Sequence, residues 1–291
     1  MNKYLRIIWR LIADPGANCF LYKKRFREKI FLARKKYFSS IPFYVKPLSG
    51  LTIAVLPREQ IAESIYMGDF EPEVLSYFLR NIKPGMVVFD VGANIGYFTT
   101  VLARLVGNAG AVHAFEPSPR EFGRIGRTLG NNQQNNVLLN QTALSEKTGR
   151  VTMNIAKTEN WAALNTMGNI THPAAQGEDF EQVEVLMDTI DNYVKAGGIK
   201  RVDLIKIDVE GAELMVLKGA ADTLKRHKPQ IICEFSDLTT KGFGYQAKEI
   251  FNWLTGQGYR AFRITNQGDV FPEPIKEHYD YDNLLFRSED R

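Results

Sequence analysis

Short apolar runs alternate with amphipathic segments through the middle of the 291-residue chain. The runs at 86–91, 111–115 and 137–141 are largely apolar and show no alternation between two faces, which is typical of parallel strands that are covered on both faces. Residues 95–106 and 119–129, which lie between these runs, have the apolar spacing of helices. The pattern therefore predicts an α/β domain with a Rossmann-like, mostly parallel sheet and helices on both faces.

The same pattern continues on both sides of this stretch. The Glu-Pro-Glu sequence at 71–73 is typical of a helix start, and the Lys-Pro-Gly sequence at 83–85 ends that helix. Residues 149–155 and 182–187 are strand-like and flank a polar segment at 156–181. Further elements are predicted as strands at 51–56, 202–208, 230–235, 259–264 and 284–286, and as helices at 212–226 and 245–255.

The first 40 residues differ from the rest of the chain in charge. They contain eleven Lys and Arg residues against Asp14 and Glu28, whereas the remainder is mildly acidic. We expect a basic helical extension with a short strand at 1–64 and the main domain at 65–291. Within residues 1–40, basic side chains recur at helical spacing beside apolar ones, which suits peripheral contact with an anionic membrane or a partner. The alternative is a helix that packs on its own domain with a solvated basic face.

The overall composition argues against several classes of protein. Hydrophobic residues make up 44% of the chain and charged residues 24%, as in ordinary globular proteins. No apolar run approaches the roughly 20 residues of a membrane span, and Cys19 and Cys233 form no metal or disulfide pattern. Because the net charge of +4 comes from the basic extension, we expect no nucleic-acid partner. We expect a cytoplasmic protein, with residues 1–40 peripheral to the inner face of the membrane.

The strongest motif follows the apolar run at 86–91. The run ends in Asp90, and a turn containing Gly92, Asn94 and Gly96 opens the next helix. Such a turn brings the main chain close to a ligand beside a helix N-terminus. The glycine spacing is not that of the dinucleotide-binding fingerprint GxGxxG, and a purely structural turn is the alternative.

A carboxylate ends the next apolar run as well. Glu116 lies at the carboxyl end of the strand predicted at 111–115, where an acidic side chain can accept hydrogen bonds from both hydroxyls of a ribose. The alternative is an exposed acid stabilised by the N-terminus of the following helix.

Acidic residues gather again near the end of the central strand predicted in the second half of the chain. Asp208, Glu210 and Glu213 crowd its end, and Glu234 ends the strand that follows. Carboxylates packed there can take a proton from a hydroxyl group or hold a divalent metal ion. Lys206 shares a strand face with Asp208 and would be buried, either as an ion-pair partner of one of these acids or as a catalytic group.

These motifs together resemble a known family. DVGANIGYFT at 90–99, FEP at 115–117, NQTALSE at 140–146 and DLIKIDVEGAE at 203–213 are similar to the FkbM family of S-adenosylmethionine-dependent methyltransferases. The resemblance covers roughly residues 65–240. It implies a class I methyltransferase fold and methyl transfer mostly to oxygen, commonly on sugars and other secondary metabolites.

The resemblance also implies which residues bind the cofactor. Those that match the family motifs are Asp90, Gly92, Asn94 and Gly96 around the methionine part of S-adenosylmethionine, Glu116 at the ribose hydroxyls, and Thr142 and Ala143 near the adenine. The ends of the chain match the family poorly, so the acceptor is expected only as a small molecule or glycan, with the oligomeric state unassigned.

Transfer to a hydroxyl group requires a base that takes its proton. Asp208 is the first candidate for that base or for a metal ligand, and Glu210 is the second. Glu234 could bind an acceptor hydroxyl. The acids leave a divalent metal open as a second cofactor, although their spacing does not require one.

The polar segment at 156–181 supplies candidate acceptor-binding residues. Asn160 and Trp161 could stack on a sugar ring, and His172 could assist proton transfer. Long loops in compact domains are usually functional or disordered, and a surface loop with an incidental tryptophan is the alternative.

Other functions fit the sequence less well. A methyltransferase acting on nitrogen in nucleic acid would need an Asn/Asp-Pro-Pro-Tyr/Phe motif, which the chain lacks. A nicotinamide oxidoreductase is disfavoured by the missing GxGxxG. A non-catalytic module that binds a membrane or a protein partner remains the alternative from a different class, although the motifs around Asp90, Glu116 and Asp208 argue against it.

Overall fold

The computed structural model describes residues 18–158, 164–171, 173 and 177–289. The chain divides into one unit of Met1–Val45 and Ala54–Phe70 and a second unit of Lys46–Ile53 and Glu71–Arg291. None of the described helices is both long and apolar enough to cross a lipid bilayer.

The second unit is built on an eight-stranded sheet. Five neighbouring strands run parallel, and β13 lies antiparallel between β10 and β11. In spatial order the strands are β12 (Val270–Pro272), β11 (Tyr259–Ile264), β13 (Asp282–Ser288), β10 (Gln230–Phe235), β9 (Leu204–Ile207), β3 (Val87–Val91), β4 (Ala111–Phe115) and β5 (Val137–Asn140).

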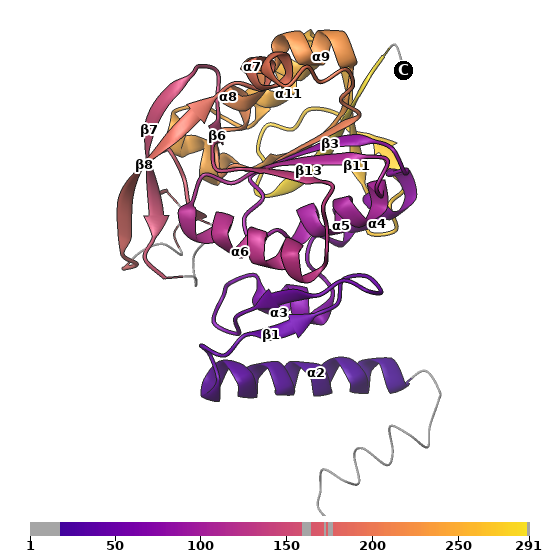
Figure 1. Cartoon of the computed structure of the whole chain (residues 1–291), viewed down its shortest axis with the longest axis vertical. Coiled ribbons are helices and arrows are strands. Elements are labelled where there is room, and N and C mark those ends of the chain that lie inside the picture. The colour runs from indigo at the N-terminus through magenta and orange to yellow at the C-terminus, as the bar shows by residue number, and fades with distance from the viewer. Residues whose placement is uncertain (1–17, 159–163, 172, 174–176, 290–291) are drawn as a thin grey trace, which may run out of the picture. The chain divides into compact units, whose positions relative to one another are not determined.

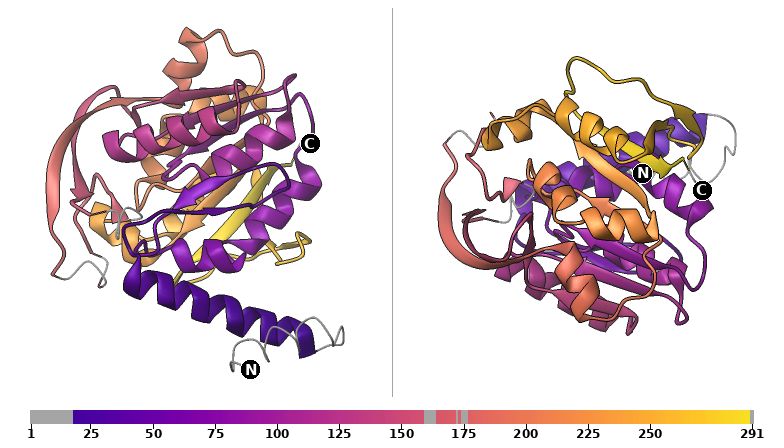
Figure 2. Two further views of the ribbon diagram at one scale, coloured as in Figure 1. Left: turned by 60° about the horizontal axis from the view of Figure 1, so that its bottom comes forward. Right: turned by 90° about the horizontal axis from the view of Figure 1, so that it is seen from above.

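Helices cover both faces of this sheet, as Figures 1 and 2 show. On one face lie α4 (Pro72–Asn81), α5 (Tyr97–Val106) and α6 (Pro119–Asn131). On the other face lie α7 (Ile190–Ala196), α8 (Glu213–Lys218), α9 (Ala221–His227) and α11 (Lys248–Gly256). This architecture confirms the expected α/β class with a mostly parallel sheet.

Local sequence signals set the starts of the helices beside the sheet. Pro72 and Pro119 occupy the first positions of α4 and α6, where a missing N–H costs nothing. Gly96 precedes α5 with a φ of 82°, a left-handed conformation that glycine adopts without strain.

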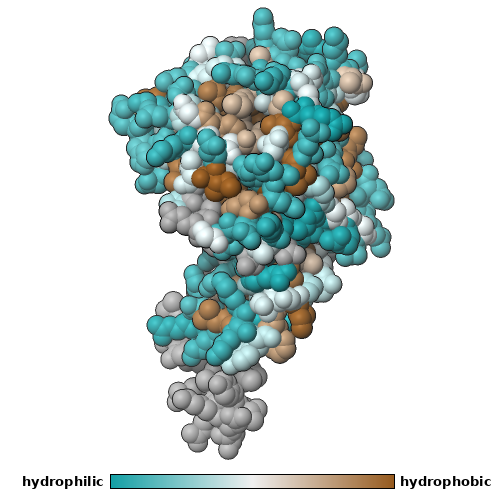
Figure 3. Space-filling view, turned by 90° about the vertical axis from the view of Figure 1, so that its left-hand side faces the viewer, coloured by the Kyte–Doolittle hydropathy of each residue, from teal (hydrophilic) through white to brown (hydrophobic). Residues whose placement is uncertain are grey.

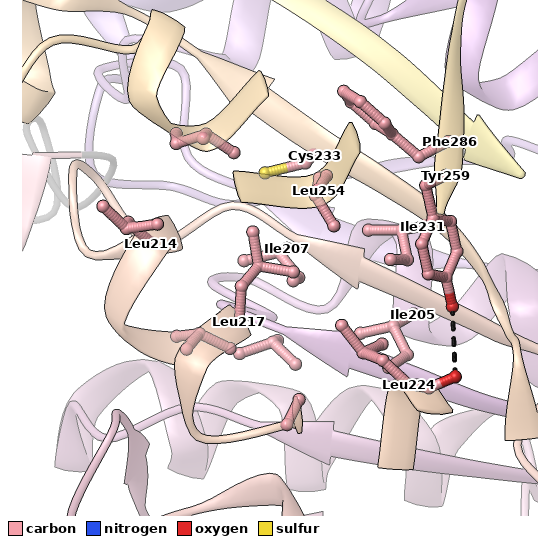
Figure 4. Close-up of a cluster of buried hydrophobic side chains, with 14 of the residues drawn as sticks. Ile205, Ile207, Leu214, Leu217, Leu224, Ile231, Cys233, Leu254, Tyr259 and Phe286 are labelled. Atoms are coloured by element: carbon pink, nitrogen blue, oxygen red, sulfur yellow. Dashed lines mark hydrogen bonds between the residues drawn. The ribbon is translucent and has the colours of Figure 1, made fainter. Parts of the chain in front are cut away.

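The main core lies between the sheet and α8, α9 and α11. Figure 4 shows side chains of β9 and β10, including Ile205 and Ile231, packed against helix residues such as Leu217 and Leu254. At one end of this core the Tyr259 hydroxyl donates to the main-chain oxygen of Leu224 over 3.4 Å. The polar tip of a large buried side chain is thus satisfied within the core.

A three-stranded sheet follows β5 in the chain. It consists of β6 (Ala143–Leu144), β8 (Phe180–Asp188) and β7 (Gly149–Ala156), in that spatial order. Met153, Ile155 and Val185 form its small core with Ala143. The two predicted strands around the polar segment are therefore confirmed as β7 and β8.

The first unit contains the basic helix α2 (Asn18–Tyr37), the strand β1 (Phe43–Val45), all of the strand β2 (Ile53–Val55) except Ile53, and the helix α3 (Ala62–Met67). Phe31 of α2 is fully buried, with ring centroids 6.1 Å from Phe43 and 5.7 Å from Tyr66. The helical prediction for residues 1–40 is confirmed for α2, and the earlier part of that segment lies outside the described residues.

Several elements differ from the sequence prediction. The single helix expected at 212–226 is wrong: α8 ends at Lys218 and α9 begins at Ala221. A Cβ on the intervening Gly219 would lie 2.0 Å from the main-chain oxygen of Ser145, so this break is set by a close tertiary approach. The prediction also missed α3, β1, β6, α7, β12 and the short helix α10 (Asp237–Thr240).

Candidate active site

The carboxyl ends of β3, β4, β9 and β10 meet at one edge of the sheet, where open α/β sheets bind their ligands. Asp90 on β3 pairs in register with Lys206 on β9, and Lys206 pairs with Ile232 on β10. Strand pairing therefore brings acidic residues from separate parts of the chain to one place.

Asp90 is buried at the end of β3, with 1% of its surface exposed. Its Oδ2 accepts a hydrogen bond of 2.5 Å from the Thr99 hydroxyl, whereas Oδ1 has no partner among the described residues. Burial raises the pKa of Asp90 and outweighs the opposing effects of Lys206 and Thr99. Asp90 thus presents an unmet acceptor beside the turn that follows.

Gly92 lies where β3 meets the end of β9. Its φ is 82°, and a Cβ there would lie 1.7 Å from the main-chain oxygen of Asp208. Asn94 also has a positive φ, of 52°, so the turn coils tightly before α5 begins after Gly96. Only glycine meets the requirements at position 92, because a side chain would push the two strands apart.

Glu116 is held by the main chain on both sides. Its Oε2 accepts from the N–H of Asn94 over 2.8 Å, and its Oε1 accepts from the N–H of Ser118 over 2.9 Å. Burial raises the pKa of Glu116 to about 8 despite these hydrogen bonds. The carboxyl is therefore fixed beside the Asp90 turn, and each oxygen retains a second lone pair for a ligand.

Thr142 and Ala143 follow β5, which pairs with β4. The N–H of Glu116 donates to the main-chain oxygen of Asn140 over 3.0 Å, which places this segment next to Glu116. Thr142 is partly exposed, whereas the side chain of Ala143 is buried in the core of the small sheet. The side chain of Ala143 is therefore not accessible to a ligand.

Lys206 and Asp208 form an ion pair at the end of β9. The Lys206 Nζ lies 2.8 Å from Asp208 Oδ2, and the two side chains are 3% and 23% exposed. Burial alone would lower the pKa of Lys206, but the carboxylates of Asp208, Glu71 and Asp90 raise it above its ordinary value. The ammonium therefore stays charged and orients the carboxylate of Asp208, which remains accessible.

Glu210 and Glu213 follow Asp208 in a tight turn. Glu210 has a φ of 53°, and Glu213 Oε1 accepts from the N–H groups of Val209 and Gly211 over 3.0 Å and 3.1 Å. Burial raises the pKa of Glu213 to about 7. Burial and then the nearby carboxylate of Asp208 raise the pKa of Glu210 well above its ordinary value. Glu213 thus shapes the turn, while Glu210 is partly exposed.

Glu234 ends β10 and is 4% exposed. Its Oε2 has no hydrogen-bond partner among the described residues. Burial, followed by the charges of Asp208 and Glu210, raises the pKa of Glu234 well above its ordinary value. Glu234 therefore presents a buried carboxyl with one unpaired oxygen at this edge of the sheet.

Three further residues of this site, Glu71, Tyr281 and Asn283, were not predicted from the sequence. Glu71, immediately before α4, accepts from the Tyr281 hydroxyl at Oε1 and from the Asn283 amide at Oε2, both over 3.3 Å. Burial raises the pKa of Glu71 to about 8, with Asp208 and Glu73 adding to the effect and Lys206 opposing it. The Glu-Pro pair at 71–72 was visible as a helix start and within the family resemblance, without a role in the site, and nothing local marks Tyr281 or Asn283.

The residues of the site fit one of the two expected cofactors. Asp90 Oδ1 and Asn94 Oδ1 are buried acceptors without partners in the described part of the chain, which suits the ammonium of the methionine part of S-adenosylmethionine. The acids are not arranged as a metal site: across residues 18–158, 164–171, 173 and 177–289, no three His, Cys, Asp or Glu side chains lie close enough to hold an ion.

The segment between β7 and β8 reaches this edge of the sheet. The Thr166 hydroxyl donates to the main-chain oxygen of Glu210 over 3.0 Å. The N–H of Asn169 donates to the main-chain oxygen of Gly242 over 3.1 Å. On the side of the second unit that carries β7 and β8, hydrophobic residues gather within a largely hydrophilic rim (Figure 3). Asn160, Trp161 and His172 lie outside the described residues.

Comparisons with known proteins agree with this geometry. The sequence model of the methyltransferase FkbM domain matches residues 90–261, and that of protein-L-isoaspartate(D-aspartate) O-methyltransferase matches residues 34–143. The 31-O-demethyl-FK506 methyltransferase FkbM of Streptomyces tacrolimicus is 30% identical over 246 residues, which cover 77% of this chain and 90% of that protein.

Two further relatives are more distant. The 2-O-methyltransferase NoeI of Sinorhizobium fredii is 28% identical over 162 residues, which cover 53% of this chain and 65% of that protein. A crystal structure of methyltransferase FkbM from Methylobacillus flagellatus is 16% identical, with a TM-score of 0.47 and coverage of 78% of this chain and 54% of that chain. The chain belongs to the FkbM-domain family and is an S-adenosylmethionine-dependent methyltransferase.

Proposed function

We propose that the enzyme transfers the methyl group to a hydroxyl group on a sugar, a glycan or a secondary metabolite. One observation carries the proposal: the accessible carboxylate of Asp208, fixed by Lys206, lies at the sheet edge beside the candidate cofactor turn. The names of the two sequence relatives, a 31-O-demethyl-FK506 methyltransferase and a 2-O-methyltransferase, support transfer to oxygen.

The cofactor end of the site is assigned to the β3 and β4 turns. We assign the methionine part to Asp90, Gly92, Asn94 and Gly96, the ribose to Glu116, and the adenine to Thr142 and Ala143. When bound, S-adenosylmethionine supplies a methyl group on a positively charged sulfur and leaves as a neutral thioether once the C–S bond breaks and the O–C bond forms.

The acceptor end requires a group that takes the hydroxyl proton as the O–C bond forms. Asp208 is the proposed base because its carboxylate is accessible and held in place by Lys206. Glu210 is the second candidate, and Glu234 is assigned to bind an acceptor hydroxyl. Asn160, Trp161 and His172 are proposed to contact the acceptor because the segment that contains them is anchored at Glu210 through Thr166.

Glu116→Ala is expected to weaken binding of S-adenosylmethionine by more than about tenfold, since two hydrogen bonds to the ribose hydroxyls are lost. The change also leaves the N–H groups of Asn94 and Ser118 without their acceptor. Calorimetric titration measures the affinity, and Glu146→Ala, an exposed acid beyond β6, is the control. An affinity equal to that of the control would contradict the ribose assignment.

Asp208→Asn is expected to lower turnover by about a hundredfold or more, because an amide cannot accept the hydroxyl proton. Transfer of label from methyl-labelled S-adenosylmethionine to cell extracts measures turnover, and calorimetry checks that cofactor binding persists. Asp269→Asn, a surface ion-pair residue, is the matched control. Full turnover in the Asp208→Asn variant would exclude Asp208 as the base and would leave Glu210 as the candidate.

Residues 1–64 are proposed as a basic extension and 65–291 as the methyltransferase domain. Residues 1–40 are proposed to contact the inner face of the membrane from the cytoplasm. Helix α2 supports this: Ile30, Leu32 and Tyr37 are 36%, 50% and 67% exposed, among the exposed basic side chains Arg25, Lys29 and Lys36.

Charge reversal on α2 tests the membrane contact. The triple variant Arg25→Glu, Lys29→Glu, Lys36→Glu is expected to lose most sedimentation with vesicles of phosphatidylserine and phosphatidylcholine, since each basic residue near the surface contributes about 1 kcal/mol. All three side chains are exposed, so the fold is preserved. The contact would be ruled out if the triple variant and the unchanged protein sedimented equally, or if the unchanged protein did not sediment with the vesicles.

A further inference from the structure

We propose that the acceptor end of the site is lined by Glu71, Glu234, Tyr281 and Asn283 and selects a polyhydroxyl acceptor that carries no negative charge, such as a neutral or amino sugar. This inference rests on the proposed transfer to oxygen and adds the chemical class of the acceptor. It is carried by the way these side chains are placed around Asp208.

Glu71 is held in an unusual main-chain conformation. Its φ of 40° and ψ of 58° lie in the left-handed region, which is costly for a residue with a side chain and recurs at functional sites. The following Pro72 fixes the start of α4, so the carboxyl of Glu71 is directed by a rigid turn. Burial raises the pKa of Glu71. The charge of Lys206 lowers this pKa and that of Asp208 raises it, because both groups lie nearby.

Tyr281 and Asn283 reach the site through the antiparallel strand β13. Asn283 pairs in register with Glu234, so the start of β13 lies beside the carboxyl end of β10. The Asn283 amide donates to Glu71 Oε2 over 3.3 Å and to Glu73 Oε1 over 3.1 Å. Tyr281 donates to Glu71 yet is 54% exposed, which leaves its ring and hydroxyl available to a bound molecule.

Glu234 supplies an independent sign that a ligand belongs here. Its Oε2 is buried without a hydrogen-bond partner among the described residues, and the residue is 4% exposed. Buried polar atoms are nearly always paired, so an unpaired one at a sheet edge requires an explanation. A hydroxyl group of the acceptor, which both donates and accepts, would complete the hydrogen bonding of Glu234.

The acidic side chains of the site disfavour an anionic acceptor. The Asn283 amide donates to the carboxyls of Glu71 and Glu73, and Asn283 pairs in register with Glu234, so three acidic residues gather around it. Lys206 lies among these acids, but it is buried and already paired with Asp208. A carboxylate or phosphate next to the methylated hydroxyl would meet several like charges, whereas hydroxyl and ammonium groups would find acceptors.

The test measures the charge of the methylated product. The full-length protein is incubated with methyl-labelled S-adenosylmethionine and extracts of small metabolites, glycolipids and polysaccharides. The products are hydrolysed to monosaccharides and separated by anion exchange at neutral pH. We expect the unretained fraction to contain at least about tenfold more label than the retained fraction.

Each other outcome has a distinct meaning. Label mainly in the retained fraction would overturn the inference while leaving methyl transfer intact. No label in any fraction, from protein that binds S-adenosylmethionine by calorimetry, would reject the proposed function and the inference with it.

Variants of the lining residues test the same site. Tyr281→Phe and Asn283→Ala are expected to raise KM for the labelled acceptor fraction by about tenfold, with kcat and S-adenosylmethionine affinity within about threefold of normal. Asn252→Ala, an exposed change on α11, is the control. Unchanged KM in both variants, or equal losses of cofactor affinity, would overturn the assignment of these residues to the acceptor.

Discussion

Replacing Lys206 with methionine is expected to lower the free energy of unfolding by about 3–5 kcal/mol and to abolish turnover. Lys206 is 3% exposed and pairs with Asp208, and its pKa is raised by carboxylates that outweigh the effect of burial. Methionine fills a similar volume but leaves Asp208 and Asp90 without their cation. Urea unfolding followed by circular dichroism measures the loss.

Two further variants make this prediction specific. Lys225→Met, an exposed change on α9, is expected to stay within about 0.5 kcal/mol of the unchanged protein. Adding Asp208→Asn to Lys206→Met is expected to restore part of the stability, because one uncompensated charge is removed. If Lys206→Met were as stable as Lys225→Met, the ion pair would have no structural importance.

Gly92→Ala is expected to weaken S-adenosylmethionine binding by about a hundredfold, or about 2.8 kcal/mol. A Cβ at this position would lie 1.7 Å from the main-chain oxygen of Asp208. Because the Cβ is fixed directly to the main chain and the atom it meets is a main-chain oxygen, β3 and β9 would have to separate, which displaces Asp90 and Asp208 together. Calorimetric titration measures the affinity, and thermal unfolding reports the accompanying loss of stability.

Gly126→Ala on α6 is the matched control. Its Cβ would meet nothing within 4 Å, and its φ is not positive. Alanine in an exposed helical position is expected to stabilise the protein by about 1 kcal/mol and to leave cofactor binding unchanged. Equal affinities for the two variants would show that the turn at Gly92 does not form the cofactor site.

The parallel half of the sheet could be predicted because its strands are buried on both faces and leave continuous apolar runs. Asp90, Glu116, Asp208 and Glu234 lie at or just beyond the carboxyl ends of those runs, so their common edge was expected from the topology of parallel strands. The pairing of Lys206 with Asp208 was one of two alternatives that the sequence left open, and the structure shows the ion pair.

The other lining residues could not be predicted for a physical reason. Glu71 and Asn283 are in contact although 212 positions separate them. Their contact depends on the antiparallel strand β13, and nothing in the local sequence indicates with which strand β13 pairs. The break at Gly219 likewise depends on its approach to Ser145, which lies in a different part of the fold. Local patterns report burial and turns, whereas these features arise from tertiary contacts.

The position of β13 in the sheet constrains the order in which the strands can be added during folding. Residues 282–288 lie between β10 and β11, so the hairpin of β11 and β12 cannot join the sheet until a later segment has been inserted beside it. Tyr281 and Asn283 reach the site only when β13 is inserted, because Tyr281 precedes this strand and Asn283 lies within it. The acceptor side would therefore be assembled last, and a nascent chain that already holds the cofactor turns would still be unable to recognise what it methylates.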